Sequence, residues 1–234
     1  MDCNYSWSFP FINRENIHLL CEIGSRDGLD SIYLADWFKA QVFCFECDPI
    51  NVEVVRANLA TSLSSIRLFP FALGDEDKTT SFFSIDPLRY SNRGASSFFK
   101  IDFSERNESD PDFGLADVQN ECTVEMKRYD GLGLAIPDLI VMDAEGSEMM
   151  VLKGFSKNLL DVSYIVTECA LFRRKDAGAS FDDVRKYLKT FGFRCAAING
   201  SRLLNFCLKV FQYHDASVRR LVGERHIDAI FVRR

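Results

Sequence analysis

The chain has 234 residues, a net charge of -6 and an apolar content of 47%. This composition predicts a folded globular protein whose chain is long enough for a sizeable core, and a single domain over residues 1–234 is the simplest expectation. The net negative charge argues against the basic face that nucleic acid requires, and no apolar run approaches the roughly 20 residues of a membrane span. We therefore expect neither a nucleic-acid partner nor a membrane partner.

The N-terminal sequence MDCNYSWSFPF lacks the basic and apolar regions of a signal peptide, which predicts a cytoplasmic protein. Of the eight cysteines, several lie within apolar runs, where a free cysteine behaves as a small hydrophobe. Cys44 and Cys47 match the pattern C-x-x-C. Because no second pair and no nearby histidine accompany them, we predict no metal site there.

The first third of the chain alternates between two kinds of segment. Apolar runs bounded by turn residues predict strands at residues 17–24, 41–46 and 66–73, and helical spacing predicts helices at 29–38 and 48–60. Asp48 is a plausible N-cap, with Pro49 at the first helical position. Pro70 stands late in the third strand, which suggests a strand end or an edge position.

Residues 75–120 are polar, and short apolar pieces interrupt them. We expect this segment to be an excursion over the sheet that covers the side where a substrate enters. Regular patterns then return, with strands predicted at 122–130, 137–143, 162–170, 193–199 and 226–234 and helices at 147–155 and 181–192. Such alternation predicts an α/β fold of Rossmann-like type with a mainly parallel sheet.

In parallel sheets, ligands bind at the carboxyl ends of the strands. Three segments therefore belong to one ligand-binding edge, namely EIGSRDG, FECDP and MDAEGSE. In the first segment, Gly24 and Gly28 flank a strand-to-helix turn. A dinucleotide site would have G-x-G-x-x-G, whereas this turn has G-x-x-x-G with Arg26 inside it. Glu22 would repel a phosphate and suits a cation, although a simple turn is the alternative interpretation.

The second segment supplies Glu46 at the end of its strand. A carboxylate about 20 residues beyond a glycine turn can accept both hydroxyl groups of an adenosine ribose, although a surface acid is the alternative. The two segments together predict an adenosine cofactor, and the missing pyrophosphate signature favours S-adenosylmethionine over NAD.

The third segment places Asp143, Glu145 and Glu148 within six residues. They could begin a helix and complement its dipole, hold a hard cation, or place a carboxylate beside a sulfonium and an acceptor hydroxyl. No histidine partner and no EF-hand pattern supports the metal hypothesis. We predict Asp143 as base or orienter of the acceptor, with Glu145 second and Glu148 serving the helix.

The sequence resembles the FkbM-type S-adenosylmethionine-dependent methyltransferases, a class I family, from about residue 20 to 194. The resemblance depends on CEIGSRDG, FECDPIN, FALGDED, GASSF, VEMKRYDGL, DLIVMDAEGSEMMVLKG and FDDVRKYLKTFGF, which occur in the family's order and spacing. It implies a seven-stranded sheet with a late antiparallel strand, and O-methylation of a hydroxyl on a sugar or a secondary metabolite. Val141 stands where the family often has lysine, and Arg26-Asp27 where small residues or asparagine are commoner.

The resemblance also implies site residues. Ala72 and Leu73 match a segment near the adenine, and Ser96 and Ser97 match a small-residue segment beside the pocket. The expected cofactor-binding residues are Glu22, Gly24, Ser25, Arg26, Asp27, Gly28, Glu46, Cys47, Ala72, Leu73 and Asp143.

Two alternative functions remain open at this level, an NAD(P)-dependent oxidoreductase and a non-catalytic nucleoside-binding module. The oxidoreductase lacks its glycine spacing and a Tyr-x-x-x-Lys pair. His18, His214 and His226 are the three histidines. His18 enters the first strand and is expected to be structural, whereas His214 or His226 could fold over the pocket as the base. The sequence identifies neither the acceptor nor the oligomeric state.

Overall fold

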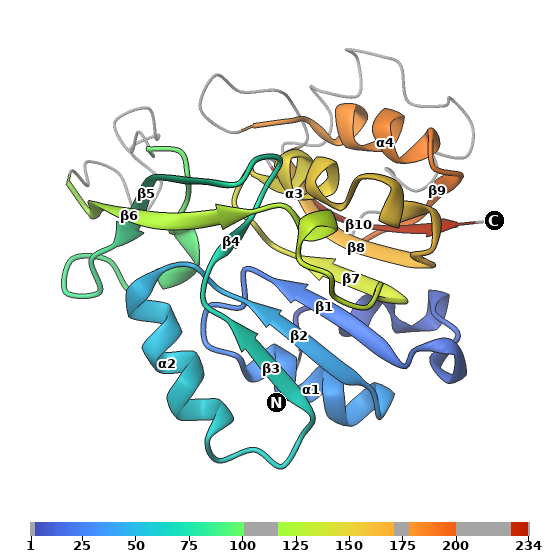
Figure 1. Cartoon of the computed structure of the whole chain (residues 1–234), viewed down its shortest axis with the longest axis horizontal. Coiled ribbons are helices and arrows are strands. Elements are labelled where there is room, and N and C mark those ends of the chain that lie inside the picture. The colour runs from blue at the N-terminus through green and yellow to red at the C-terminus, as the bar shows by residue number, and fades with distance from the viewer. Residues whose placement is uncertain (1–2, 101–116, 171–177, 200–225, 234) are drawn as a thin grey trace.

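The computed structural model describes residues 3–100, 117–170, 178–199 and 226–233, and His214 lies outside these ranges. The central sheet has seven strands in the order β3-β2-β1-β7-β8-β10-β9 (Figure 1). These strands are β1 (Leu19–Ile23), β2 (Gln41–Phe45), β3 (Ile66–Phe69), β7 (Leu139–Met142), β8 (Tyr164–Ala170), β9 (Phe193–Ile198) and β10 (His226–Arg233). Among the described strands of this sheet, β10 alone runs opposite to the rest, which confirms the predicted mainly parallel sheet with a late antiparallel strand.

Helices cover both faces of this sheet (Figure 1). One face packs against α1 (Leu29–Phe38), α2 (Pro49–Leu59) and the N-terminal 3-10 helices Ser6–Phe11 and Arg14–Asn16. The other face packs against α3 (Glu148–Phe155) and α4 (Phe181–Lys189). Shorter 3-10 helices occupy Arg93–Ala95, Tyr129–Gly131 and Ser156–Leu160. Both layers bury continuous apolar clusters, as expected for strands covered on both sides.

The N-terminus of α2 forms as the sequence predicts. Asp48 accepts a hydrogen bond from the backbone N–H of Ile50 at 2.9 Å, and Pro49 is the first helical residue. The carboxyl group therefore satisfies a donor that the helix itself leaves unpaired. Its second oxygen, Oδ2, accepts from Ser84 at 2.8 Å and from Ser96 at 2.6 Å, which ties the excursion to the end of β2.

A second sheet of three strands, in the order β4-β6-β5, lies beside the first. Its strands are β4 (Ala72–Leu73), β5 (Lys78–Ile85) and β6 (Gln119–Lys127). The predicted strand at 66–73 is in fact two strands, because Pro70 ends β3 and the chain continues into the other sheet. The excursion also contains more regular structure than the sequence indicates, since β5 pairs with β6 along its length.

Helix α3 approaches the second sheet closely at Gly154. A Cβ atom on Gly154 would lie 2.0 Å from the carbonyl oxygen of Gly74, so no larger residue fits without a shift of backbone. The sequence predicts that the helix ends near this glycine, and it ends at Phe155. Gly154 is therefore a residue inside the helix that permits the close contact with Gly74, and it does not cap the helix. This contact fixes the position of α3, the helix that follows the edge segment MDAEGSE.

Candidate active site

The register of the sheet aligns two of the predicted edge segments, those after β1 and β7, with the end of β8. Ile23 pairs with Met142, and Met142 pairs with Thr167. Continuing this register by one residue places Gly24, Asp143 and Glu168 in one row across the carboxyl ends of β1, β7 and β8. The row explains why carboxylates separated in sequence gather at one edge.

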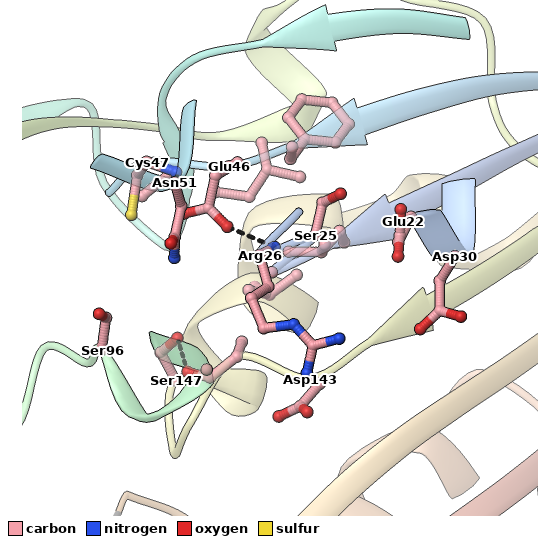
Figure 2. A pocket seen from close by; sticks show the side chains of 18 of the residues that line it. Glu22, Ser25, Arg26, Asp30, Glu46, Cys47, Asn51, Ser96, Asp143 and Ser147 are labelled. Carbon is pink, nitrogen blue, oxygen red and sulfur yellow. Dashed lines mark hydrogen bonds between the residues drawn. The ribbon is translucent and has the colours of Figure 1, made fainter. Parts of the chain in front are cut away.

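A cavity with about 770 Å³ of empty space, part of it open solvent, lies over this edge (Figure 2). Its lining includes the glycine turn after β1, the segment after β2 and the segment after β7. The described lining residues carry four carboxylates and one basic side chain, namely Glu22, Asp30, Glu46, Asp143 and Arg26. This excess of acidic over basic side chains suits a cationic ligand and disfavours a phosphate.

The glycine turn is fixed by contact with the segment after β7. Gly24 has φ +80°, and a Cβ atom there would lie 1.9 Å from the carbonyl oxygen of Asp143. Its N–H donates to the carbonyl oxygen of Phe45 at 3.0 Å, which joins the turn to β2 as well. Only glycine satisfies both the positive φ and the close approach. The turn thus sets the distance between the first and third segments.

The other residues of the glycine turn have two different roles: some line the cavity, and the others stabilise the turn and the start of α1. Ser25 and Arg26 line the cavity, whereas Asp27 and Gly28 do not. Asp27 accepts from the N–H of Leu29 at 3.1 Å, and Gly28 takes φ +76° just before α1. These two predicted cofactor-binding residues therefore shape the turn and the start of the helix.

Glu46 is buried and holds the glycine turn to the end of β2. Its Oε2 accepts from the N–H of Arg26 at 2.7 Å, as Figure 2 shows. Its Oε1 accepts from the N–H groups of Cys47 and Asp48, both at 2.8 Å. Burial raises the pKa of Glu46 to about 7, although these hydrogen bonds favour the ionised form. Cys47, the next residue, also lines the cavity.

Glu22 lies on β1 beneath the turn and is 1% exposed. Its carboxylate accepts a hydrogen bond from the Ser31 hydroxyl on α1. Burial raises the pKa of Glu22 to about 8, and the charge of Asp30 acts in the same direction. A bound cation would stabilise the ionised form of this carboxyl, so Glu22 is matched to a positive group.

Three residues that line this cavity each have a buried side-chain oxygen with no hydrogen-bond partner, by geometry, in the part of the chain that the structure describes. These oxygens are Ser25 Oγ, Asn51 Oδ1 and Asp143 Oδ1. Buried polar atoms are rarely left without a partner, since each costs about 1–3 kcal/mol. Their common position indicates that polar groups of a ligand complete them.

The far end of the cavity is apolar. Phe71, Ala72, Leu73, Phe82 and Phe98 line it, next to Cys47 and Ser96. Aromatic and aliphatic walls at this distance from the acidic end suit the flat ring of a nucleobase. The sequence-based positions Ala72, Leu73 and Ser96 are therefore brought together, whereas Ser97 does not line the cavity. Ser97 Oγ instead donates to the carbonyl oxygen of Glu145 at 2.7 Å.

The three acids after β7 have different surroundings. Glu148 is buried, and its Oε1 accepts from the N–H groups of Ala144 and Gly146 at 3.2 and 3.0 Å, so it holds the loop before its helix. Glu145 lines neither this cavity nor its neighbour, and its φ of +47° is unusual for a residue with a side chain. Asp143 lines both cavities. Burial, with the charges of Glu168 and Glu145, raises its pKa well above the ordinary range.

The neighbouring cavity has about 850 Å³ of empty space, again including solvent, and residues of the adjacent strands β7, β8 and β10 form part of its lining. Its polar lining residues are Asn4, Tyr5, Asp143, Thr167, Glu168, Asn199, His226 and Asp228. Apart from Asp143 and the candidate base His226, the sequence does not single out these residues. The available signal was one acid within each apolar strand, Glu168 near the end of YIVTECA and Asp228 near the start of HIDAIFVR.

The sheet order, the glycine turn and the acidic edge together define a Rossmann-like methyltransferase fold. The profile described as "Methyltransferase FkbM domain" matches residues 22–195, and the chain belongs to this methyltransferase family. The resemblance stated from the sequence is therefore confirmed.

Among curated proteins, 2-O-methyltransferase NoeI of Sinorhizobium fredii (strain NBRC 101917 / NGR234) is 31% identical over 160 residues. The match covers 64% of this chain and 62% of that protein, so the chain spans less than two thirds of this relative's length.

Solved structures share the fold at low sequence identity. An FkbM methyltransferase from Methylobacillus flagellatus KT is 14% identical with a TM-score of 0.55, over 97% of this chain and 46% of that one. TrmK of M. capricolum, solved in complex with S-adenosyl-homocysteine, is 9% identical with a TM-score of 0.50, over 100% of this chain and 68% of that one.

The described residues contain neither a membrane-spanning helix nor a cluster of metal ligands. Within these ranges, no helix is both long enough and apolar enough to cross a membrane. The same ranges contain no group of three or more His, Cys, Asp or Glu side chains arranged to hold a metal ion.

Proposed function

We propose that this protein is an S-adenosylmethionine-dependent O-methyltransferase that acts on a hydroxyl group of a sugar or another small metabolite. The observation that carries the cofactor assignment is the set of three unpartnered buried polar atoms in a cavity with four carboxylates and an apolar end. When bound, S-adenosylmethionine supplies an electrophilic methyl group on a sulfonium centre. Glu46 would face its ribose, the apolar end would hold its adenine, and Glu22 and Asp143 would face its cationic end.

Transfer to oxygen is supported by the similarity of this chain to a protein named as a 2-O-methyltransferase. Asp143 is the acid that lines both cavities, so we assign it the orientation of the acceptor hydroxyl beside the methyl group. Holding the two reactants in line and excluding water supply most of the acceleration that such a transfer needs.

Binding and transfer can be tested together. S-Adenosylhomocysteine should bind in calorimetry, whereas NAD should not. A panel of methyl hexopyranosides, assayed with radiolabelled S-adenosylmethionine, should contain an acceptor whose 2-deoxy analogue is inactive if oxygen 2 is the target. Binding of NAD in place of S-adenosylhomocysteine would support the oxidoreductase, and binding of neither would support a non-catalytic module.

Cofactor binding should release protons at slightly acidic pH. In the ligand-free protein the pKa of Glu22 is raised to about 8 and that of Glu46 to about 7, so both carboxyls are largely protonated near about pH 6. A cationic ligand favours their ionised forms, and its affinity should rise as the pH increases from about 6 toward 8. Calorimetry in two buffers of different ionisation enthalpy measures the release; proton uptake on binding would contradict this assignment of the acidic end.

Asp143→Asn should lower methyl transfer far more than it lowers cofactor affinity. The substitution keeps the size of the side chain but replaces one carboxyl oxygen, which can accept from the acceptor hydroxyl, with an NH₂ group, so kcat should fall by about 30-fold, somewhat less than loss of an oxyanion-hole donor. Asp161→Asn, at an exposed position, is the matched control and should leave kcat unchanged. If Asp143→Asn transferred methyl groups at the wild-type rate, the role of Asp143 in the reaction would be wrong.

A further inference from the structure

The second cavity is joined to the first at its acidic end. Asn4, Tyr5 and Asp143 line both cavities, and none of the three belongs to the apolar end. A ligand whose ribose lies at Glu46 and whose cationic end lies near Glu22 therefore directs that end toward the second cavity. A reaction partner in the second cavity would reach the cofactor past Asp143.

His226 and Glu168 form a hydrogen-bonded pair in this cavity. His226 Nδ1 lies 2.7 Å from Glu168 Oε1, and the histidine side chain is 42% exposed. The two residues come from adjacent antiparallel strands and share one face, because His226 pairs with Ala170 and Asp228 pairs with Glu168. A carboxylate on Nδ1 fixes the ring and its tautomer, and leaves Nε2 to meet a ligand.

We propose that the second cavity holds the methyl acceptor and that His226 takes the proton from the acceptor hydroxyl, with Glu168 as its positioning residue. This inference rests on the proposed function. The acceptor oxygen gains the methyl group as its O–H bond breaks, and the proton passes to Nε2 of His226. The electron pair of the broken carbon–sulfur bond returns to sulfur, which leaves a neutral thioether and an imidazolium ion. Glu168 stabilises that ion.

The charges around the pair support this division of roles. The charges of Glu145, in the segment after β7, and of Glu148, at the start of α3, act on His226, and Asp228 lies on the same strand as the histidine. The hydrogen bond to Glu168 raises the pKa of His226 above 6.5, and the nearby acids act in the same direction. Burial raises the pKa of Glu168, but the hydrogen bonds and charge of His226 outweigh it and lower that pKa.

Asp143 is less suited to accept the proton. Its pKa is raised well above the ordinary range, first by burial and then by Glu168, with which it shares a hydrogen bond. A carboxyl that already holds a proton donates to Glu168 and cannot be the base in that state. Asp143 can still orient the acceptor through Oδ1, because this oxygen has no hydrogen-bond partner among the described residues.

The lining also restricts the class of acceptor. The second cavity is lined by carboxyl and amide groups, which belong to Asn4, Asp143, Glu168, Asn199 and Asp228. No lysine or arginine is among its described lining residues. Such groups match the several hydroxyls of a neutral sugar or polyol and repel a phosphorylated or carboxylated acceptor. The proposed acceptor site therefore lies beside β8 and β10. The sequence instead led us to expect the acceptor under the excursion at residues 75–120. The described residues of that excursion that line a cavity line the first one, namely Phe82, Gly94, Ser96 and Phe98.

A nuclear magnetic resonance titration tests the pair without an acceptor. The imidazole signals of the protein, assigned to His226 with the variant His226→Gln, should give a pKa above 6.5 for His226, and Glu168→Gln should lower it by about one unit. Glu121→Gln, an exposed control on β6, should not change it. A His226 pKa that is equal in wild type and Glu168→Gln would overturn the positioning role.

Kinetics with an accepted methyl hexopyranoside test the proton transfer. Since the neutral ring is the base, wild-type kcat/KM should rise with pH through the His226 pKa, and His226→Gln should lose this rise and about 100-fold in kcat while binding S-adenosylhomocysteine normally. His18→Gln should behave as wild type, and Asp143→Asn should keep the rise with pH. Glu168→Gln should shift the rise to lower pH.

The outcomes separate the two proposals. A wild-type protein that does not bind S-adenosylhomocysteine would end the proposed function itself. A wild-type protein that binds and transfers methyl groups, with a pH profile and rate unchanged in His226→Gln, would end only the assignment of the base. Preference for a phosphorylated over a neutral glycoside, or transfer to none of the glycosides, would overturn the acceptor class.

Discussion

Replacing Gly24 with alanine is expected to abolish measurable binding of S-adenosylhomocysteine. Alanine at φ +80° costs roughly 1–2 kcal/mol. The new Cβ would lie 1.9 Å from the carbonyl oxygen of Asp143, and relieving such a contact costs about 1–3 kcal/mol more. Because the displaced backbone groups line the cavity, we expect affinity to fall at least about 1,000-fold, equivalent to about 4 kcal/mol. Calorimetry and chemical denaturation measure the two effects.

Gly133→Ala is the matched control for this substitution. Gly133 has φ +63°, but a Cβ atom there meets nothing within 4 Å. It therefore carries the conformational cost of about 1–2 kcal/mol without the steric one, and it should leave cofactor affinity unchanged. If the two variants lost equal stability and both bound S-adenosylhomocysteine normally, the contact between the glycine turn and Asp143 would not position the site.

The sequence predicts the parallel part of the fold well because local patterns specify it. Buried strands read as apolar runs, and the Asp48-Pro49 pair begins α2 where it is predicted. The glycine turn, Glu46 and Asp143 reach one edge because parallel strands end on the same side of a sheet. Each of these inferences depends on a short segment and on one general rule of topology.

The second cavity could not be predicted in the same way, because its parts meet only through the order of the strands. Glu168 and His226 are 58 positions apart in sequence, and they become neighbours because β10 inserts between β8 and β9. Tyr5 and Asn4 come from the N-terminal segment, whose sequence carries no motif. Likewise, the state of Asp143 depends on Glu168 beside it, which the segment DAEGSE does not contain.

Replacing Glu46 with alanine should reduce cofactor affinity through two effects. The carboxylate would lose its contact with the ribose hydroxyls, and the N–H groups of Arg26, Cys47 and Asp48 would lose their acceptor. A buried donor left unpaired costs about 1–3 kcal/mol, so the combined loss should reach about 4 kcal/mol, or about 1,000-fold in affinity. Titration calorimetry with S-adenosylhomocysteine measures this loss.

Glu46→Gln separates the two effects. Glutamine keeps one side-chain oxygen, which can accept from Cys47 and Asp48, but it presents an NH₂ group to the N–H of Arg26. We therefore expect an intermediate loss of cofactor affinity, about tenfold to 100-fold. The acceptor for Cys47 and Asp48 is kept, but the glutamine NH₂ group and the N–H of Arg26 are two donors that face each other. The matched surface control, Glu125→Gln, should have no effect, since that side chain is exposed. Unchanged affinity in Glu46→Ala would contradict the ribose contact, because the cofactor would then not depend on this carboxylate either directly or through the turn that it holds.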